Sequence, residues 1–194
     1  MTRKATVYQC VVIGCSAGGR DALQKLFRLL PKDFPLPVIV VQHLAADKDE
    51  YFDKYLQESC LLKIKEADEK EPVMAGTIYM APANYHLLIE PDETLSLTTD
   101  KKVNFSRPSI DVLFESAADV YGPYLIGIIL TGASKDGAFG LKCIHEKGGL
   151  TIVQDPSTAE LSFMPRSAME TTKVDYILSL EAIGKLLIQL NKGI

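Results

Sequence analysis

Short, strongly apolar runs alternate along this chain with longer stretches of helical periodicity. Four runs are almost wholly large and apolar, as in strands whose two faces are both buried; they cover residues 8–13, 38–41, 124–130 and 150–153. Amphipathic stretches such as 21–30 and 109–120 repeat apolar residues every three or four positions. This order predicts parallel strands joined by crossover helices that cover both faces of one sheet.

The middle of the chain has short strand-like segments that are separated by proline and glycine turns. They span residues 61–64, 77–80, 86–90 and 94–98, and the last two predict a hairpin. The other expected elements are a polar helix over 48–57, a helix over 138–147, a loop through Pro156 and Pro165, a strand over 176–178 and a helix over 180–190. We therefore predict a three-layer α/β/α fold, with a doubly wound, mostly parallel sheet and an antiparallel edge hairpin.

Length and composition favour one globular domain. The 194 residues are 47% hydrophobic and 24% charged, and no linker or repeat divides residues 1–194. The net charge of −4 argues against nucleic acid as a partner. No apolar run approaches the ~18 residues of a membrane span, so we expect no membrane insertion. The N-terminus lacks a signal-peptide pattern and the four cysteines fit no zinc spacing, which favours a cytoplasmic protein with reduced thiols.

Three polar side chains follow the buried strands. Ser16 comes directly after the first strand and His43 comes after the second, while Asp136 lies in the small, polar loop that follows the third. Because ligands sit beyond the carboxyl ends of the strands in such sheets, we expect the three residues to converge. A nucleophilic serine needs a base, and the base needs a carboxylate that fixes its tautomer. The sequence therefore predicts a Ser-His-Asp hydrolase, with the aspartate in a polar loop outside the core.

Glycines around these residues indicate where backbone donors lie. The glycine-rich turn after the first strand brings a helix N-terminus, with its free N–H groups, beside Ser16. Gly132 and Gly137 allow the loop after the third strand to approach closely. We therefore expect the backbone N–H groups of Ala17 and Ala133 to form an oxyanion hole.

The same residues have ordinary alternatives. Glycine-rich turns after a first strand often bind dinucleotides, but that fingerprint has glycine where Ser16 stands and an acidic residue where His43 stands. Cys15 is better explained as a small buried residue, because neighbouring strand residues point in opposite directions. His145 is expected on a helix surface. His86 lies beside another strand end, and no chemical step is assigned to it.

Taken together, these motifs resemble the catalytic domain of the CheB-type chemotaxis receptor protein-glutamate methylesterases. The matching segments occur in the family's order: IGCSAGG at 13–19, VQH at 41–43, APANYHL at 81–87, RPSID at 107–111, LTGASKDGA at 130–138, QDP at 154–156 and MPRSA at 164–168. The resemblance implies a three-layer α/β/α fold and a triad of Ser16, His43 and Asp136, the residues that the strand-end argument selects. It implies neither a metal nor a cofactor.

The family's activity sets the functional expectation. Its members hydrolyse glutamate γ-methyl esters on the cytoplasmic helices of chemoreceptors, releasing methanol, and many also deamidate receptor glutamines. We therefore expect chemotaxis signalling and methylated receptor helices as partners. Typical members carry a phosphorylatable receiver domain. Here we expect a single catalytic domain over residues 1–194, which is active without aspartyl phosphorylation.

Three positions depart from the family pattern. The family has methionine at Ala133 and glycine at Ser134, and it commonly has threonine at Ala17. The methionine supplies the family's oxyanion donor through its backbone N–H, which alanine retains. These departures leave open a second function, a catalytically weak signalling or binding module of the same fold, which ester turnover would distinguish. A nucleotide-binding domain is a third hypothesis, disfavoured by Ser16 and His43.

Overall fold

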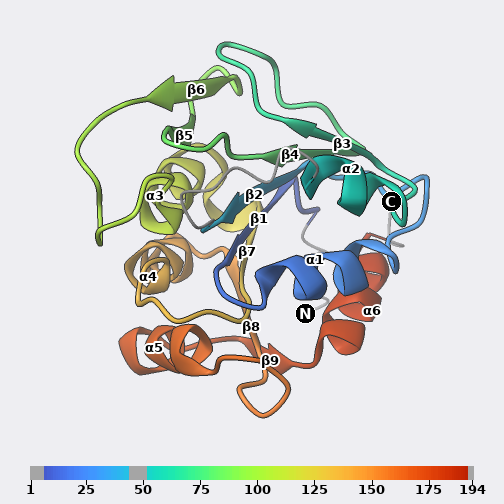
Figure 1. Cartoon of the computed structure of the whole chain (residues 1–194), viewed down its shortest axis with the longest axis vertical. Helices are drawn as coiled ribbons and strands as arrows, with labels where there is room; N and C mark the ends of the chain where they lie inside the picture. Colours follow the sequence, from blue (N-terminus) through green and yellow to red (C-terminus); the bar gives the residue numbers. More distant parts are fainter. Residues whose placement is uncertain (1–6, 44–51, 192–194) are drawn as a thin grey trace, which may run out of the picture.

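A seven-stranded parallel sheet forms the middle layer of the computed structural model, which describes residues 7–43 and 52–191 (Figure 1). Its strands are β1 (Cys10–Cys15), β2 (Val38–Gln42), β3 (Lys63–Glu66), β4 (Thr77–Met80), β7 (Leu125–Ile129), β8 (Leu150–Gln154) and β9 (Tyr176–Leu178). Their order is β3-β4-β2-β1-β7-β8-β9, and every neighbouring pair is parallel. The order changes direction between β1 and β7, and such a switch point is where ligands bind in doubly wound sheets.

Helices cover both faces of the sheet. They are α1 (Gly19–Phe27), α2 (Phe52–Gln57), α3 (Ile110–Tyr121), α4 (Ala138–Glu146), α5 (Phe163–Thr171) and α6 (Leu180–Leu190), and a short 3₁₀ turn, Gly122–Tyr124, precedes β7. In Figure 1, α1, α2 and α6 lie on one side, and α3, α4 and α5 lie on the other. Alternate residues of β1 serve the two layers: Val11 and Ile13 belong to one core cluster, Cys10 and Val12 to the other. The predicted three-layer fold is confirmed.

The predicted antiparallel hairpin consists of β5 (His86–Ile89) and β6 (Leu95–Thr98). It forms a two-stranded sheet of its own, rather than an edge of the large sheet. Its buried residues Leu87 and Leu95 belong to the core cluster that α3 also fills. The Ser116 hydroxyl of α3 accepts a hydrogen bond from the Ile89 N–H at 3.1 Å. Packing against α3 therefore holds the hairpin.

One helix lies where the sequence indicated only a loop. α5 contains Pro165, a residue that was expected in a loop. Pro165 is the third residue after the N-cap Ser162, within the first turn, where the N–H that proline lacks has no intrahelical partner anyway. The expected polar helix over 48–57 corresponds to α2 at its C-terminal end, and residues 48–51 lie outside the described ranges.

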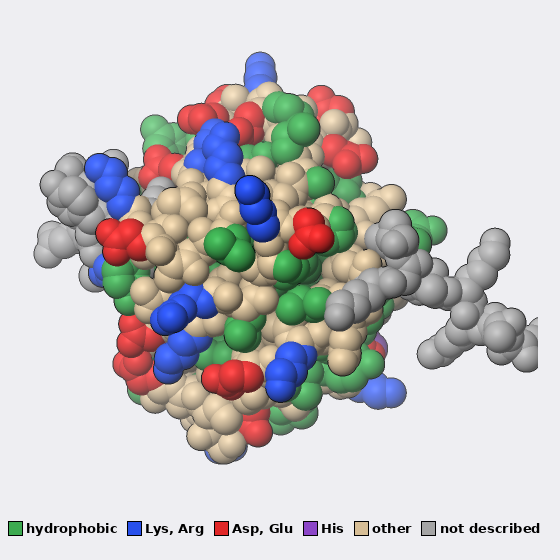
Figure 2. All heavy atoms as spheres, turned by 90° about the vertical axis from the view of Figure 1, so that its right-hand side faces the viewer, with side chains coloured by type: hydrophobic (Ala, Val, Ile, Leu, Met, Phe, Trp, Pro, Cys, Tyr) green, Lys and Arg blue, Asp and Glu red, His purple; other side chains and the backbone are tan. Residues whose placement is uncertain are grey.

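The surface carries charges of both signs. On the side where α2 and α6 lie in Figure 1, Lys and Arg are interspersed with Asp and Glu (Figure 2). Among the described residues, there is no helix with the length and apolar character that crossing a bilayer requires.

Candidate active site

The end of β1 places Ser16 between its two neighbouring strands. The β1–β2 register pairs Cys15 with Gln42, so the next residues along the two strands are also neighbours. These residues are Ser16 and His43, and the His43 N–H donates to Cys15 O at 3.0 Å. On the other side, the Ser16 N–H donates to the carbonyl of Thr131, just after β7, at 3.0 Å. Ser16 therefore stands at the switch point of the sheet.

A tight turn follows Ser16 and starts α1. Gly18, at the N-cap of this helix, adopts a φ of 75°, which favours glycine. The Gly19 N–H donates to Ser16 O at 2.8 Å, and the Gln42 side-chain amide donates to the same oxygen at 2.8 Å. The turn leaves Ala17 exposed beside the N-terminus of α1.

Gly132 lies directly against Ser16. A Cβ on Gly132 would lie 2.9 Å from Ser16 Cβ and 2.8 Å from Met164 Sδ, so a larger residue would not fit. The next residue, Ala133, is exposed. Within the described part of the chain, the N–H groups of Ala17 and Ala133 have no hydrogen-bond partner. Both groups are therefore available to an oxyanion at Ser16.

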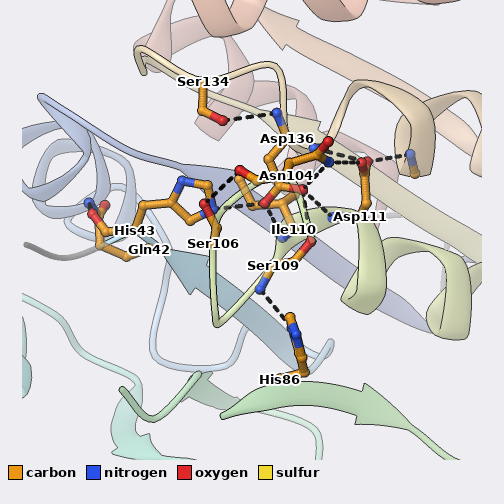
Figure 3. A network of polar contacts seen from close by, with 12 residues as sticks. Gln42, His43, His86, Asn104, Ser106, Ser109, Ile110, Asp111, Ser134 and Asp136 are labelled. Atoms are coloured by element: carbon orange, nitrogen blue, oxygen red, sulfur yellow. Dashed lines mark hydrogen bonds and ion pairs between the residues drawn. The ribbon is translucent and has the colours of Figure 1, made fainter. Parts of the chain in front are cut away.

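His43 and Asp136 are in direct contact. His43 Nε2 lies 2.8 Å from Asp136 Oδ2, with the imidazole 12% exposed and the carboxylate fully buried (Figure 3). Because Nε2 faces Asp136, Nδ1 is the ring nitrogen left for Ser16. No hydrogen bond joins Ser16 Oγ to this imidazole among the described residues. The structure thus brings His43 and Asp136 together and places Ser16 on the adjacent strand end, and such contacts often tighten only when substrate binds.

Asp136 accepts hydrogen bonds at both carboxylate oxygens. Oδ2 accepts from His43 and from the Ile110 N–H at 2.7 Å. Oδ1 accepts from the Ser109 hydroxyl at 2.8 Å and from the Asn104 amide at 3.0 Å. Burial alone would raise the pKa of Asp136, but these hydrogen bonds, that from His43 foremost, lower it below its ordinary value. The carboxylate is thereby held ionised where it can orient His43.

The expectation that Asp136 lies in a polar loop outside the core is wrong. Its side chain is 0% exposed, and it accepts the N–H groups of Ile110 and Asp111 at the start of α3. Ser109 occupies the N-cap of α3, but its hydroxyl donates to Asp136 instead of capping the helix. Asp136 therefore supports the N-terminus of α3 as well as His43.

Asp111 does the same for α4. Its Oδ1 accepts the N–H groups of Gly137 at 2.9 Å and Gly140 at 2.7 Å, at the N-terminus of that helix. Each of the two helices thus begins against a carboxylate, which its N-terminal partial positive charge favours. Burial raises the pKa of Asp111, and the nearby charge of Asp136 contributes to the same shift.

Asn104 joins the two carboxylates. Its Nδ2 donates to Asp111 Oδ2 at 2.7 Å and to Asp136 Oδ1 at 3.0 Å (Figure 3). Neither Asn104 nor Asp111 was expected at the site from the sequence. The one feature of the sequence that could have indicated Asp111 is its place in segment 107–111, which resembles the family pattern. Nothing in the pattern around Asn104 indicated that it reaches the site.

Replacing Asn104 by alanine should destabilise the protein by about 1–3 kcal/mol at neutral pH, because two facing carboxylates lose a shared donor. Without this donor, the pKa values of Asp111 and Asp136 rise in the folded state. Since the folded variant then binds protons more readily, the difference from wild type should shrink as the pH falls from about 7 to 4. Urea unfolding across this pH range measures the difference in the free energy of unfolding between Asn104→Ala and wild type.

The exposed amide Gln189 on α6 offers a matched control. Gln189→Ala should leave the free energy of unfolding near that of wild type at every pH. A stability loss in Asn104→Ala that is independent of pH would contradict the role of Asn104 as a bridge between carboxylates.

Three further residues that the sequence raised can now be placed. His86 is buried; its Nδ1 accepts the Ser109 N–H at 3.2 Å and its Nε2 donates to Lys101 O at 3.1 Å, so it supports a neighbour of the site. His145 is half-exposed on α4. Cys15 is fully buried, and its thiol donates to Gln42 Oε1 at 2.8 Å, as expected for a packing residue.

Ser134, which stands where the resemblance implies a glycine, causes no strain. It is not among the residues with a positive φ, and its hydroxyl accepts the Asp136 N–H at 3.1 Å. The loop therefore keeps a conformation that serine readily adopts.

The CheB methylesterase family matches residues 11–187 of this sequence. The chain belongs to this family. A putative protein-glutamate methylesterase/protein-glutamine glutaminase from Leptospira interrogans is 55% identical over 186 residues, which cover 96% of each chain. The protein-glutamate methylesterase FrzG of Myxococcus xanthus is 38% identical over 94% of this chain, which spans 54% of that longer protein. The CheB methylesterase catalytic domain of Thermotoga maritima has a similar structure, with a TM-score of 0.90 and 35% identity over 94% of this chain and 98% of that one.

Proposed function

We propose that this CheB-family chain hydrolyses glutamate γ-methyl esters on chemoreceptor-type proteins, with Ser16 as its nucleophile. Protein-glutamate methylesterase and protein-glutamine glutaminase activity is the activity of the family to which it belongs. The observation that best supports the proposed mechanism is the His43–Asp136 contact of 2.8 Å, beside the strand end that carries Ser16.

The proposed reaction has two halves. Ser16 Oγ attacks the ester carbonyl while His43 Nδ1 takes the hydroxyl proton, and Asp136 stabilises the resulting imidazolium. The N–H groups of Ala17 and Ala133 donate to the oxyanion. The intermediate collapses, the C–O bond to the methoxy group breaks, and methanol leaves with the proton from His43. Water activated by His43 then hydrolyses the acyl-enzyme, which restores Ser16 and leaves a glutamate side chain on the substrate protein. With a glutamine substrate, ammonia leaves in place of methanol.

The departures from the family pattern are compatible with catalysis. Ala17 and Ala133 would act through backbone N–H groups, which alanine retains. Ser134 is accommodated without a left-handed backbone. These positions therefore give little support to the alternative of a catalytically weak signalling or binding module.

We further propose that the protein works in the cytoplasm, where its partners are methylated receptor helices. Its four cysteines are unpaired, as expected in a reducing compartment. Every residue of the proposed machinery lies between Ser16 and Asp136, so we propose that residues 1–194 hydrolyse the ester without the help of a phosphorylated partner.

The direct test is methanol release from a methylated cytoplasmic receptor fragment by the purified chain, with no phosphoryl donor added. We expect methanol to form in proportion to the loss of methyl ester. A folded chain that leaves the methyl esters intact would overturn the proposed function. Activity that appeared only with a phosphorylated partner would overturn the proposal that the chain acts without one.

A further inference from the structure

One aromatic ring stands apart from the rest of the surface. Phe105 is 96% exposed, whereas the other exposed large hydrophobic residues in the described ranges are between 37% and 66% exposed. Scattered apolar residues on a surface need no explanation, but an almost fully solvated phenylalanine gains nothing from the fold. Its position therefore calls for a cause outside packing.

The backbone at Phe105 adopts a conformation that bulky residues seldom have. Val103 and Ser106 exchange two backbone hydrogen bonds, at 3.1 and 2.8 Å, so that only two residues form the turn. These residues, Asn104 and Phe105, have φ values of 49° and 63°. Such turns favour an Asn-Gly pair. Asn104 fits this preference, but phenylalanine stands where glycine would cost least.

The turn is anchored to the candidate active site. The Asn104 amide donates to Asp136 and Asp111, and Asp136 contacts His43. Figure 3 shows the loop of Asn104 and Ser106 beside the imidazole. Phe105 therefore follows directly after Asn104, the residue that donates to the carboxylate that orients His43.

The base of the loop is also braced. Arg107 Nη1 donates to Thr99 O at 2.6 Å and to Asp100 O at 2.9 Å. The buried His86 donates to Lys101 O at 3.1 Å. Since the loop is held at its tip and its base, the backbone at Phe105 is held in place, which lowers the loop-ordering entropy lost when a partner covers the ring.

A second loop adds apolar side chains near Ser16. Leu161, which lies just before the N-cap of α5, and Phe163, the first residue of that helix, are 41% and 56% exposed. Leu161 O accepts the N–H of Gly132, the residue that contacts Ser16. Apolar side chains therefore belong to two loops that are bonded to the candidate site.

We propose that Phe105 is a docking contact for the protein substrate, packing against apolar side chains of the helix that carries the ester. The inference rests on the proposed function and specifies how the site distinguishes a protein from a small ester. A small ester needs only Ser16, His43, Asp136 and the oxyanion donors. A helix that presents its ester to Ser16 also covers the neighbouring surface, where the ring stands.

The test compares two substrates with Phe105→Gly, which removes the ring and suits the positive φ. For the methylated receptor fragment, KM should rise roughly 10- to 100-fold, as on loss of a central aromatic contact. For p-nitrophenyl acetate, kcat/KM should stay at the wild-type value. Phe105→Leu, which keeps an apolar side chain, should have a KM for the receptor fragment close to that of wild type. Tyr124→Ala serves as control, because Tyr124 is also exposed (45%) but lies at the opposite end of the sheet, before β7.

The possible outcomes are distinguishable. An unchanged KM for the receptor fragment in Phe105→Gly would overturn the docking role. Equal losses on both substrates, or a lower melting temperature, would also overturn it, since they indicate a structural role. Wild-type protein that cleaves p-nitrophenyl acetate but never the receptor fragment would overturn the proposed function, and the docking role with it.

Discussion

Alanine at position 16 should lower kcat for methyl-ester hydrolysis by roughly 10⁴- to 10⁶-fold, as is typical when a serine hydrolase loses its nucleophile. Without Ser16 Oγ no acyl-enzyme can form, and only binding and the oxyanion donors remain. The melting temperature should hardly change, because Ser16 is half-exposed and its hydroxyl makes no hydrogen bond within the described residues. Methanol release and a thermal melt measure the two quantities.

Ser59→Ala is a suitable control for this variant. Ser59 is also half-buried, but it lies just after α2, on the opposite side of the sheet from α3 and α4 (Figure 1). The control should retain wild-type turnover. If Ser16→Ala kept more than about a tenth of wild-type kcat, Ser16 could not be the nucleophile.

Asparagine in place of Asp136 should cost both activity and stability. An asparagine can present N–H₂ to His43, which favours the wrong tautomer, and it cannot stabilise imidazolium, so kcat should fall by at least roughly 10²-fold. The buried carboxylate also accepts hydrogen bonds at both oxygens, from Ile110 and Ser109 among others. An amide has one accepting oxygen, and we expect a loss of about 3 kcal/mol in the free energy of unfolding.

The pH dependence of this stability loss has a definite sign. The folded pKa of Asp136 lies below its ordinary value of 3.8, so its carboxylate stabilises the fold above that pH, and this contribution disappears as the pH falls through the folded pKa. Urea unfolding should therefore show a constant difference between wild type and Asp136→Asn near neutrality and a smaller one below about pH 4. The exposed Asp33 provides the control Asp33→Asn. A variant as stable as wild type would show that the hydrogen bonds to Asp136 contribute little.

The strands of the sheet could be predicted well because the residues of each strand, by themselves, favour a buried extended conformation. Runs such as 38–41 are apolar and β-branched throughout, and little else than a strand buried on both faces suits them. The helix α5 was missed because Pro165 resembles a loop residue, and only the preceding N-cap reveals that it belongs to a first turn. The hairpin was predicted, but its separation from the large sheet depends on packing against α3, which no local pattern encodes.

The site shows the same division between local and long-range information. The convergence of Ser16, His43 and Asp136 at one edge of the sheet could be predicted because each follows a strand, and parallel strands bring their ends together. The burial of Asp136 could not be inferred, since it depends on Ile110 and Ser109 from a distant segment. Nothing in the sequence of residues 103–106 indicated an exposed ring, because solvent exposure depends on the packing of distant segments.

The most direct measurement of the central claim is the position at which an organophosphonate ester labels the protein. Such reagents form a covalent bond with a serine only when a neighbouring base activates it. We predict that mass spectrometry will find a single modified residue, Ser16, and that His43→Ala will abolish the labelling while the variant remains folded. Labelling of a different serine, such as Ser106 or Ser134, or undiminished labelling of Ser16 in His43→Ala, would contradict the account.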